Sequence, residues 1–355
     1  MNLERVEKIA EAVLYEGYML YPYRPSSIKN QQRWNFGVLY PQSWCDSQSG
    51  SEASSMQTEC LVRVTESSRI TVKVRFLQIV QRLVGKVRAL DNESPCGTNF
   101  EYELVDRFEA NGRVYLPWQE AIERELTYTA LDPLSLSSHP CMQFSFPAGK
   151  SIEYLFDDRE RVSGAIVRQR ESLTGAVHFS SECCLEGVVK IGVRVNNLTA
   201  LVPIHASGRE AVLMHSLVSA HTILGVEHGE FVSLLEPPQD MEGFAAQCKN
   251  SGTWPVLIGE KGEEHADTML SSPIILYDYP QIAPESAGNL FDSTEIDEIL
   301  SLRILTLTDD EKREMRESDD RTRAILERTE AMPGEQFMKL HGVLRGMTPV
   351  QEEVR

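Results

Sequence analysis

The common signatures of catalysis are missing from this 355-residue sequence. It contains no Gly-x-Ser-x-Gly nucleophile motif and no glycine-rich phosphate-binding pattern, so the familiar hydrolase and nucleotide-binding classes receive no support. Its seven cysteines are odd in number and include no Cys-x-x-Cys pair, which argues against a disulfide framework. Reduced thiols suit a cytoplasmic protein, and we expect that location.

Long apolar runs and an excess of positive charge are also absent. No uninterrupted apolar run approaches the roughly 18 to 20 residues that span a bilayer, so we expect no membrane insertion. Only 35 basic residues stand against 53 acidic ones, giving a formal net charge of −18. Because phosphate neutralisation needs clustered Lys and Arg, this balance predicts that the chain does not bind nucleic acid.

What the sequence does contain is alternation typical of β-strands. The runs Leu61–Val64 and Ile70–Phe76 flank a Ser-Ser step and predict a hairpin. Further predicted strands are Arg113–Leu116, Glu125–Ala130, Met142–Phe146, Ser163–Arg168, Gly175–Phe179, Val188–Val195, Phe231–Leu235 and Pro273–Tyr277. These strands do not alternate regularly with long helices, which favours antiparallel connections over a parallel doubly wound sheet.

Helical periodicity is confined to a few segments. Apolar residues at helical spacing predict helices over residues 3–14 and 209–223. A third helical region begins with a cap at Ser293 or Thr294, and Thr308 followed by Glu311 has the pattern of a capping box. The predicted class is therefore α+β: a mainly antiparallel β core with an N-terminal helix and a C-terminal helical, acidic extension.

This pattern also suggests domain boundaries. We expect residues 1–280 to form a β-rich core domain that includes the N-terminal helix, residues 281–346 a helical extension, and residues 347–355 a tail. Prolines near residue 280 mark the first boundary, because a residue that precedes proline is pushed out of the α region.

One segment near the N-terminus is unusually aromatic and basic. Residues 18–36 hold five aromatic rings and three cations. The side chains that we assign to a candidate recognition surface are Tyr21, Tyr23, Arg24, Lys29, Arg33 and Trp34. Tyrosine and tryptophan offer large contact areas, and arginine offers a planar fork for carboxylates. The alternative is that the rings pin a long loop across the sheet.

A second candidate interaction element follows the last predicted strand. Tyr277, Asp278 and Tyr279 lie in an extended stretch that Pro280 and Pro284 interrupt. Such a stretch is either a docking strip for a partner or a strap that joins the sheet to the helices. The sequence leaves both possibilities open.

Metal ligation receives little support. His215, His221 and His228 are close in sequence, but His215 and His221 would lie roughly 120° apart on a helix. The adjacent Cys183 and Cys184 would point to opposite faces of a strand, and we expect them to be buried, inert thiols. The sequence therefore predicts no metal centre and no cofactor.

Three stretches together resemble a known family. They are residues 18–41 around Tyr-Pro-Tyr-Arg-Pro-Ser, residues 221–238, and residues 272–311 from Ser-Pro-Ile-Ile-Leu onward. They are similar to an uncharacterised bacterial family that is associated with NiFe-hydrogenase gene clusters. The resemblance implies an accessory or assembly protein, a chaperone or scaffold in hydrogenase maturation, whose partners are hydrogenase subunits or maturation factors. It carries over no catalytic residues.

The leading hypothesis is thus a non-enzymatic protein that acts through protein–protein interaction. One alternative is an enzyme that holds a small acidic substrate, with His221, His228, Asp278 or Glu285 as acid and base. Another is a structural subunit of a larger complex. Neither the partner nor the oligomeric state follows from the sequence.

Overall fold

The fold is dominated by antiparallel β-structure. The computed structural model describes residues 6, 7, 9, 10, 14, 36–48, 52–87, 100–138, 141–201, 208–259, 266–280, 304–318 and 320–333. The strands are β1 Ser55–Val87, β2 Tyr102–Val105, β3 Phe108–Ala110, β4 Arg113–Tyr115, β5 Trp118–Leu131, β6 Met142–Phe146, β7 Gly149–Phe156, β8 Val162–Arg170, β9 Leu173–Leu185, β10 Val188–Asn197, β11 Val218–Val232, β12 Trp254–Ile258 and β13 Thr268–Ser272. The mainly antiparallel β prediction is confirmed.

Helices are few and short. They are α2 Gln42–Ser47, α3 Arg209–Leu213, α4 Glu242–Ala245, α6 Asp309–Ser318 and α7 Asp320–Ala331, with a 3-10 turn, η2, at Leu136–Ser138. Among the residues that the structure describes, no helix combines the length and apolarity needed to cross a bilayer.

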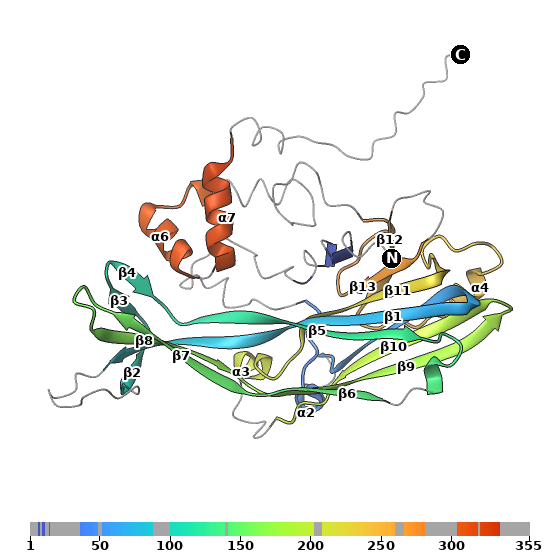
Figure 1. Ribbon diagram of the computed structural model, residues 1–355, viewed down its shortest axis with the longest axis horizontal. Helices are drawn as coiled ribbons and strands as arrows, with labels where there is room; N and C mark the ends of the chain where they lie inside the picture. Colours follow the sequence, from blue (N-terminus) through green and yellow to red (C-terminus); the bar gives the residue numbers. More distant parts are fainter. Residues whose placement is uncertain are drawn as a thin grey trace, which may run out of the picture.

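Strand β1 organises the sheet. It is 33 residues long, and β-branched residues alternate with polar ones over much of its length. Along one edge it pairs in turn with β10, β5 and β2, and along the other edge with β11 and β8. Figure 1 shows the result, an elongated molecule in which β1 runs from one end to the other.

The first part of β1 folds back over the second. Thr58 contacts Ser271, whose strand neighbour Thr222 pairs with Val74 of β1 itself. In a straight strand Thr58 and Val74 would be about 50 Å apart. The chain instead bends at a bulge between Val64 and Arg69.

This bend corrects the predicted hairpin. The runs around Val62 and Val72 do not pair with each other, because each pairs with a different part of β11. Both strands of the ribbon turn together: β11 has a positive φ of 54° at His228, opposite the bulge. The serine hydroxyl of Ser68 donates a hydrogen bond to the His228 carbonyl and fixes the corner.

The two arms of β1 enclose the main core between two layers. Cys60 and Val62 of the first arm belong to the same apolar cluster as Val72 and Phe76 of the second. The Phe76 ring lies 5.8 Å from the Phe144 ring of the opposite layer, centroid to centroid. Burial of these residues from both layers provides the main stabilisation of the sandwich.

A second long ribbon forms the opposite layer and extends beyond it. β6 and β7 pair with β9 and β8 in one continuous register, so residues 142–156 and 162–177 form a single interrupted hairpin. Its base lies in the sandwich, and its tip pairs with the far end of β1 through β8. We call the place where this hairpin is interrupted, around residues 147–149 and 170–172, the waist.

Helices cover the outer faces. Val6, Ile9 and Ala10 are helical, as predicted, and pack on Ile223 and Leu270. At the other end of the molecule α6 and α7 pack on Trp118 of β5. The predicted capping box is confirmed, because Thr308 N–H donates to Glu311 Oε2 at 2.7 Å. The caps expected at Ser293 and Thr294 lie outside the described residues, and the division into domains stays a prediction.

Three further secondary-structure predictions are wrong in whole or in part. The strand expected over Phe231–Leu235 ends at Val232, the last residue of β11. The helix expected over residues 209–223 ends at Leu213, and β11 begins at Val218. Nine consecutive residues from Val218 are buried, because both faces of this strand are covered. A continuous apolar run of this kind also satisfies helical spacing, so periodicity alone predicts a helix here. The strand expected at Pro273–Tyr277 is irregular, because the ladder ends at Ser272 and Pro273 has no N–H to continue it.

A buried triangle of hydroxyl groups joins the two layers and can be tested. Thr58 Oγ1 lies 2.7 Å from Ser271 Oγ and 3.1 Å from Thr253 Oγ1. Thr58→Val keeps the side-chain shape but removes these bonds, so we expect the free energy of unfolding to fall by about 1–2 kcal/mol in urea titrations. The exposed Thr127→Val is the matched control. Equal stability of both variants would show that the triangle does not stabilise the packing of the two layers.

Candidate functional site

The predicted interaction strip lies beside the outer edge of β12. Asp278 is half-buried, and its Oδ1 accepts a hydrogen bond from the Leu257 N–H at 2.7 Å. Its Oδ2 accepts the hydroxyl hydrogen bond of Ser233 at the end of β11. The same Ser233 oxygen accepts the N–H groups of Leu235 and Glu236 at 3.1 and 2.8 Å. One carboxylate therefore ties together three separate segments.

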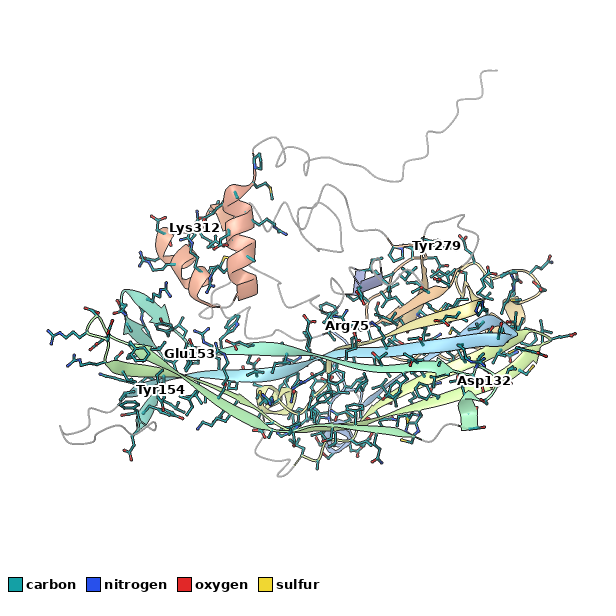
Figure 2. The ribbon with its side chains drawn as sticks, viewed as in Figure 1. Arg75, Asp132, Glu153, Tyr154, Tyr279 and Lys312 are labelled. Carbon is teal, nitrogen blue, oxygen red and sulfur yellow. The ribbon has the colours of Figure 1, made fainter. Side chains whose placement is uncertain are left out.

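These contacts close the edge of the sheet. Tyr279 N–H donates to the Leu257 carbonyl at 2.8 Å, so both outward backbone groups of Leu257 are occupied. Two residues earlier, Pro255 has no N–H to offer. Figure 2 shows Tyr279 above β12 and β13 at this edge. Addition of a partner strand here is blocked, which favours the strap interpretation for Asp278 and Tyr279.

The neighbouring side chains point outward. Tyr277 is 85% exposed and Ile275 is 72% exposed, whereas Tyr279 packs against the main core. Leu235, which follows Ser233, is 53% exposed. We call Leu235, Ile275 and Tyr277 the junction surface. Its backbone is held by the Asp278 contacts, so its apolar side chains are presented from a fixed frame.

The predicted aromatic and basic segment precedes the described stretch that begins at Phe36. Tyr21, Tyr23, Arg24, Lys29, Arg33 and Trp34 lie outside the described residues. The described chain resumes at Phe36, whose carbonyl accepts the Ser219 N–H at 3.2 Å. Gly37 follows with φ 54° and lies so close to Pro273 that an added Cβ would stand 2.5 Å from its Cγ. The end of this segment is therefore anchored two residues from Ile275.

The three histidines are not brought together. His221 is fully buried in β11, and His228 is exposed at the corner, roughly 20 Å further along the strand. His215 lies before β11, beside α3. No group of three His, Cys, Asp or Glu side chains within the described ranges is arranged to hold a metal ion.

Burial dominates the electrostatics of His221. Its Nδ1 lies 2.9 Å from the Ser219 carbonyl, which fixes the proton on that nitrogen, and its buried Nε2 has no hydrogen-bond partner among the described residues. Desolvation, with a smaller contribution from the nearby Arg75, lowers the pKa of His221 to about 4, against the opposing effect of the Ser219 hydrogen bond. This histidine is neutral at physiological pH and acts as a core residue.

The acid–base set expected for an enzyme is also dispersed. His221 is sealed in the sheet, His228 is at the corner, and the carboxylate of Asp278 is used by Leu257 and Ser233. Glu285 lies outside the described residues. The described members of this set therefore share no pocket.

A thiol–imidazole contact has no local signal in the sequence. Cys141 Sγ lies 3.4 Å from His178 Nε2, and both side chains are exposed. Their proximity depends on the pairing of β6 with β9, so only knowledge of the register could have found it. The expectation for Cys183 is corrected too: it is exposed, and Cys184 is half-buried, because β9 ends in an open part of the sheet.

The corner of the ribbon contains a cleft of about 810 Å³. Its lining includes Arg63, Thr65, His228 and Glu230. Arg63 Nη1 and Glu230 Oε2 lie 3.8 Å apart across it, so the cation in this lining is already paired. Most of its lining residues are polar, with Val64 and Val226 between them, and the cleft follows from the bulge.

Comparison with known proteins adds no relative. No protein-family model matches the chain, and no curated protein matches it.

The Asp278 contacts predict separate roles for adjacent residues. Asp278→Ala leaves the Leu257 N–H without its acceptor, so we expect a loss of about 1–3 kcal/mol in the free energy of unfolding. Tyr277→Ala removes an exposed side chain and should change it by less than about 0.5 kcal/mol. Chemical denaturation measures both. A Tyr277 variant as unstable as the Asp278 variant would contradict the exposed placement of that ring.

The buried imidazole predicts a pH dependence. The unfolded chain binds a proton near pH 6.5 and the folded chain only near pH 4, so the stabilisation is present above pH 6.5 and is lost as pH falls toward 4. The loss attributable to His221 is of the order of 3 kcal/mol. His221→Asn should flatten this part of the stability–pH curve, and the exposed His228→Asn should not. Parallel curves for all three proteins would refute the assignment.

Proposed function

We propose that the chain is a protein-binding accessory factor that uses the junction surface to contact its partner. The observation that carries this proposal is the high exposure of Ile275 and Tyr277 on a backbone that Asp278 holds in place. Isolated exposed apolar residues are ordinary on soluble proteins. Three large ones around one fixed junction are the kind of surface that a partner covers.

The rigid frame matters for affinity. Binding costs side-chain and loop ordering at an interface, and a backbone that is already fixed has less freedom to lose. Tyr277 also combines a large ring with a polar hydroxyl, which suits residues that dominate binding energy. The junction surface therefore has the properties of a small docking element, and other contacts must supply the remaining interface area.

The aromatic and basic segment is the second element of the proposal. The contact of Gly37 with Pro273 anchors the end of that segment next to the junction surface. Arg24, Lys29 and Arg33 would add charge-assisted contacts to partner carboxylates. A continuous interface of this kind would combine the two candidate regions that the sequence suggested separately.

The resemblance supplies the class of partner. We propose hydrogenase subunits or maturation factors, for which the chain would act as a chaperone or scaffold. This part of the proposal rests on the resemblance alone. A non-enzymatic role agrees with the dispersal of His221, His228 and Asp278.

Affinity purification with matched variants tests the proposal. The tagged protein is isolated from its native host beside Ile275→Ser/Tyr277→Ser and Arg24→Gln/Arg33→Gln. The control is Leu104→Ser/Phe156→Ser, which removes two other large exposed apolar residues, 54% and 51% exposed, from β2 and β7. We expect hydrogenase subunits or maturation factors with the parent and the control, and at least about tenfold less with the junction variant.

The outcomes separate the parts of the proposal. Full recovery with the junction variant would remove that surface, and full recovery with the arginine variant would remove the N-terminal segment. Specific recovery of other proteins would retain the binding function and reject the hydrogenase role. The absence of any specific partner with the parent protein would reject the function itself.

A further inference from the structure

Two arginines approach the waist from different strands, and neither has an acidic partner among the described residues. Arg124 belongs to β5 in one layer, and Arg170 is the last residue of β8 in the other ribbon. Neither guanidinium has a carboxylate within ion-pair distance among the described residues. This is unexpected in a chain with a net charge of −18, because acidic side chains are abundant.

Arg124 is held by a buried amide. Gln78 is fully buried, and its Oε1 accepts hydrogen bonds from Arg124 Nε at 2.9 Å and Nη2 at 2.7 Å. Gln78 Nε2 in turn donates to the Glu171 carbonyl at 2.7 Å. The guanidinium also lies 4.5 Å above the centre of the Phe146 ring. These contacts fix the orientation of Arg124 and leave its Nη1 without an acceptor in the described structure.

The Arg170 guanidinium occupies the space that a side chain at position 149 would fill. Its guanidinium lies against Gly149, where an added Cβ would stand 2.7 Å from Cζ and 2.8 Å from Nη2. Its Nε donates to the Pro147 carbonyl at 3.3 Å. Because glycine has no Cβ, the planar group can lie flat on the backbone. Both Nη groups of Arg170 lack acceptors within the described ranges.

A neighbouring arginine shows what is different here. Arg168 lies two residues before Arg170 on the same face of β8, and it has two carboxylate partners at 2.8 Å, Glu120 and Glu153. Figure 2 shows Glu153 on this part of the sheet. Burial lowers the pKa of Arg124, and the charge of Arg170 lowers it further, so the two cations interact. The charge of Arg168 is therefore balanced by two carboxylates, whereas no described carboxylate balances Arg124 or Arg170.

From this arrangement we propose that Arg124 and Arg170 bind a small oxyanion, a phosphate or a carboxylate. Two guanidinium groups with fixed planes offer several parallel N–H donors, which match the oxygen geometry of such ions. The anion would offset the repulsion between the two cations. The acidic character of the whole chain disfavours large polyanions and favours a small ligand. This site is independent of the junction surface.

Thermal unfolding tests the site. Inorganic phosphate and, separately, succinate replace chloride at constant ionic strength, so that nonspecific screening stays equal. A ligand that binds only the folded state raises the midpoint temperature with its concentration. We expect one of the two anions to raise it in a saturable way for the parent protein. Arg170→Gln should abolish the rise, and Arg159→Gln, an exposed loop arginine, should preserve it.

Calorimetric titration of the same anions gives a second readout that does not depend on variant stability. Loss of the Arg170 guanidinium should raise the dissociation constant of the anion at least about tenfold in Arg170→Gln. Arg170→Lys keeps the charge but not the planar donors and should fall between the two. The absence of saturable binding to the parent protein would overturn the proposal, as would equal binding by parent and Arg170→Gln. A preference for phosphate over succinate, or the reverse, identifies the class of ligand.

Discussion

The fold depends on a single constraint, the bend that β1 and β11 share. Because both strands turn at the same place, one ribbon supplies the frame of two layers. Its edges remain available for β10, β5 and β13, and β8 pairs with β1 beyond the end of β11. The cost of the bulge is local: Ser68 and Thr65 rebuild part of the hydrogen bonding that the ladder loses there. In return the apolar faces of both arms are buried in one core.

Polar side chains, more than turns, then connect the separate parts. Asp278 joins β12 to the end of β11, Gln78 joins the two ribbons at the waist, and Thr58 joins the two layers. Each of these groups is at least half-buried, where a satisfied polar contact specifies one arrangement and an unsatisfied one is costly. The junction surface and the arginine pair both lie next to such a connection. Their geometry is therefore set by the fold and not by local sequence.

Local patterns predicted the strands better than their partners. Met142–Phe146 was predicted with the bounds of β6, and the capping box at Thr308 was read correctly, because both depend on neighbouring residues. The bend of β1 and the contacts of Asp278 depend on residues far away in sequence, so periodicity could not reveal them. The sequence indicates Tyr277 to Tyr279 as an interaction element. Only the structure shows that Tyr277 is exposed and that Asp278 and Tyr279 are anchored. The segment from Tyr21 to Trp34 stays a prediction.

The return of β1 onto the last strands has a consequence for how the chain reaches its native state. Thr58 and Ser271 are separated by 213 residues. The faces of β1 are covered only after β11 and β13 have also formed. During synthesis from the N-terminus, this strand emerges long before the segments that complete it. Contacts of such long range slow folding, and unpaired strands are prone to aggregate meanwhile. The nascent chain is thus expected to depend on help from the cell's own folding machinery until residue 272 has left the ribosome.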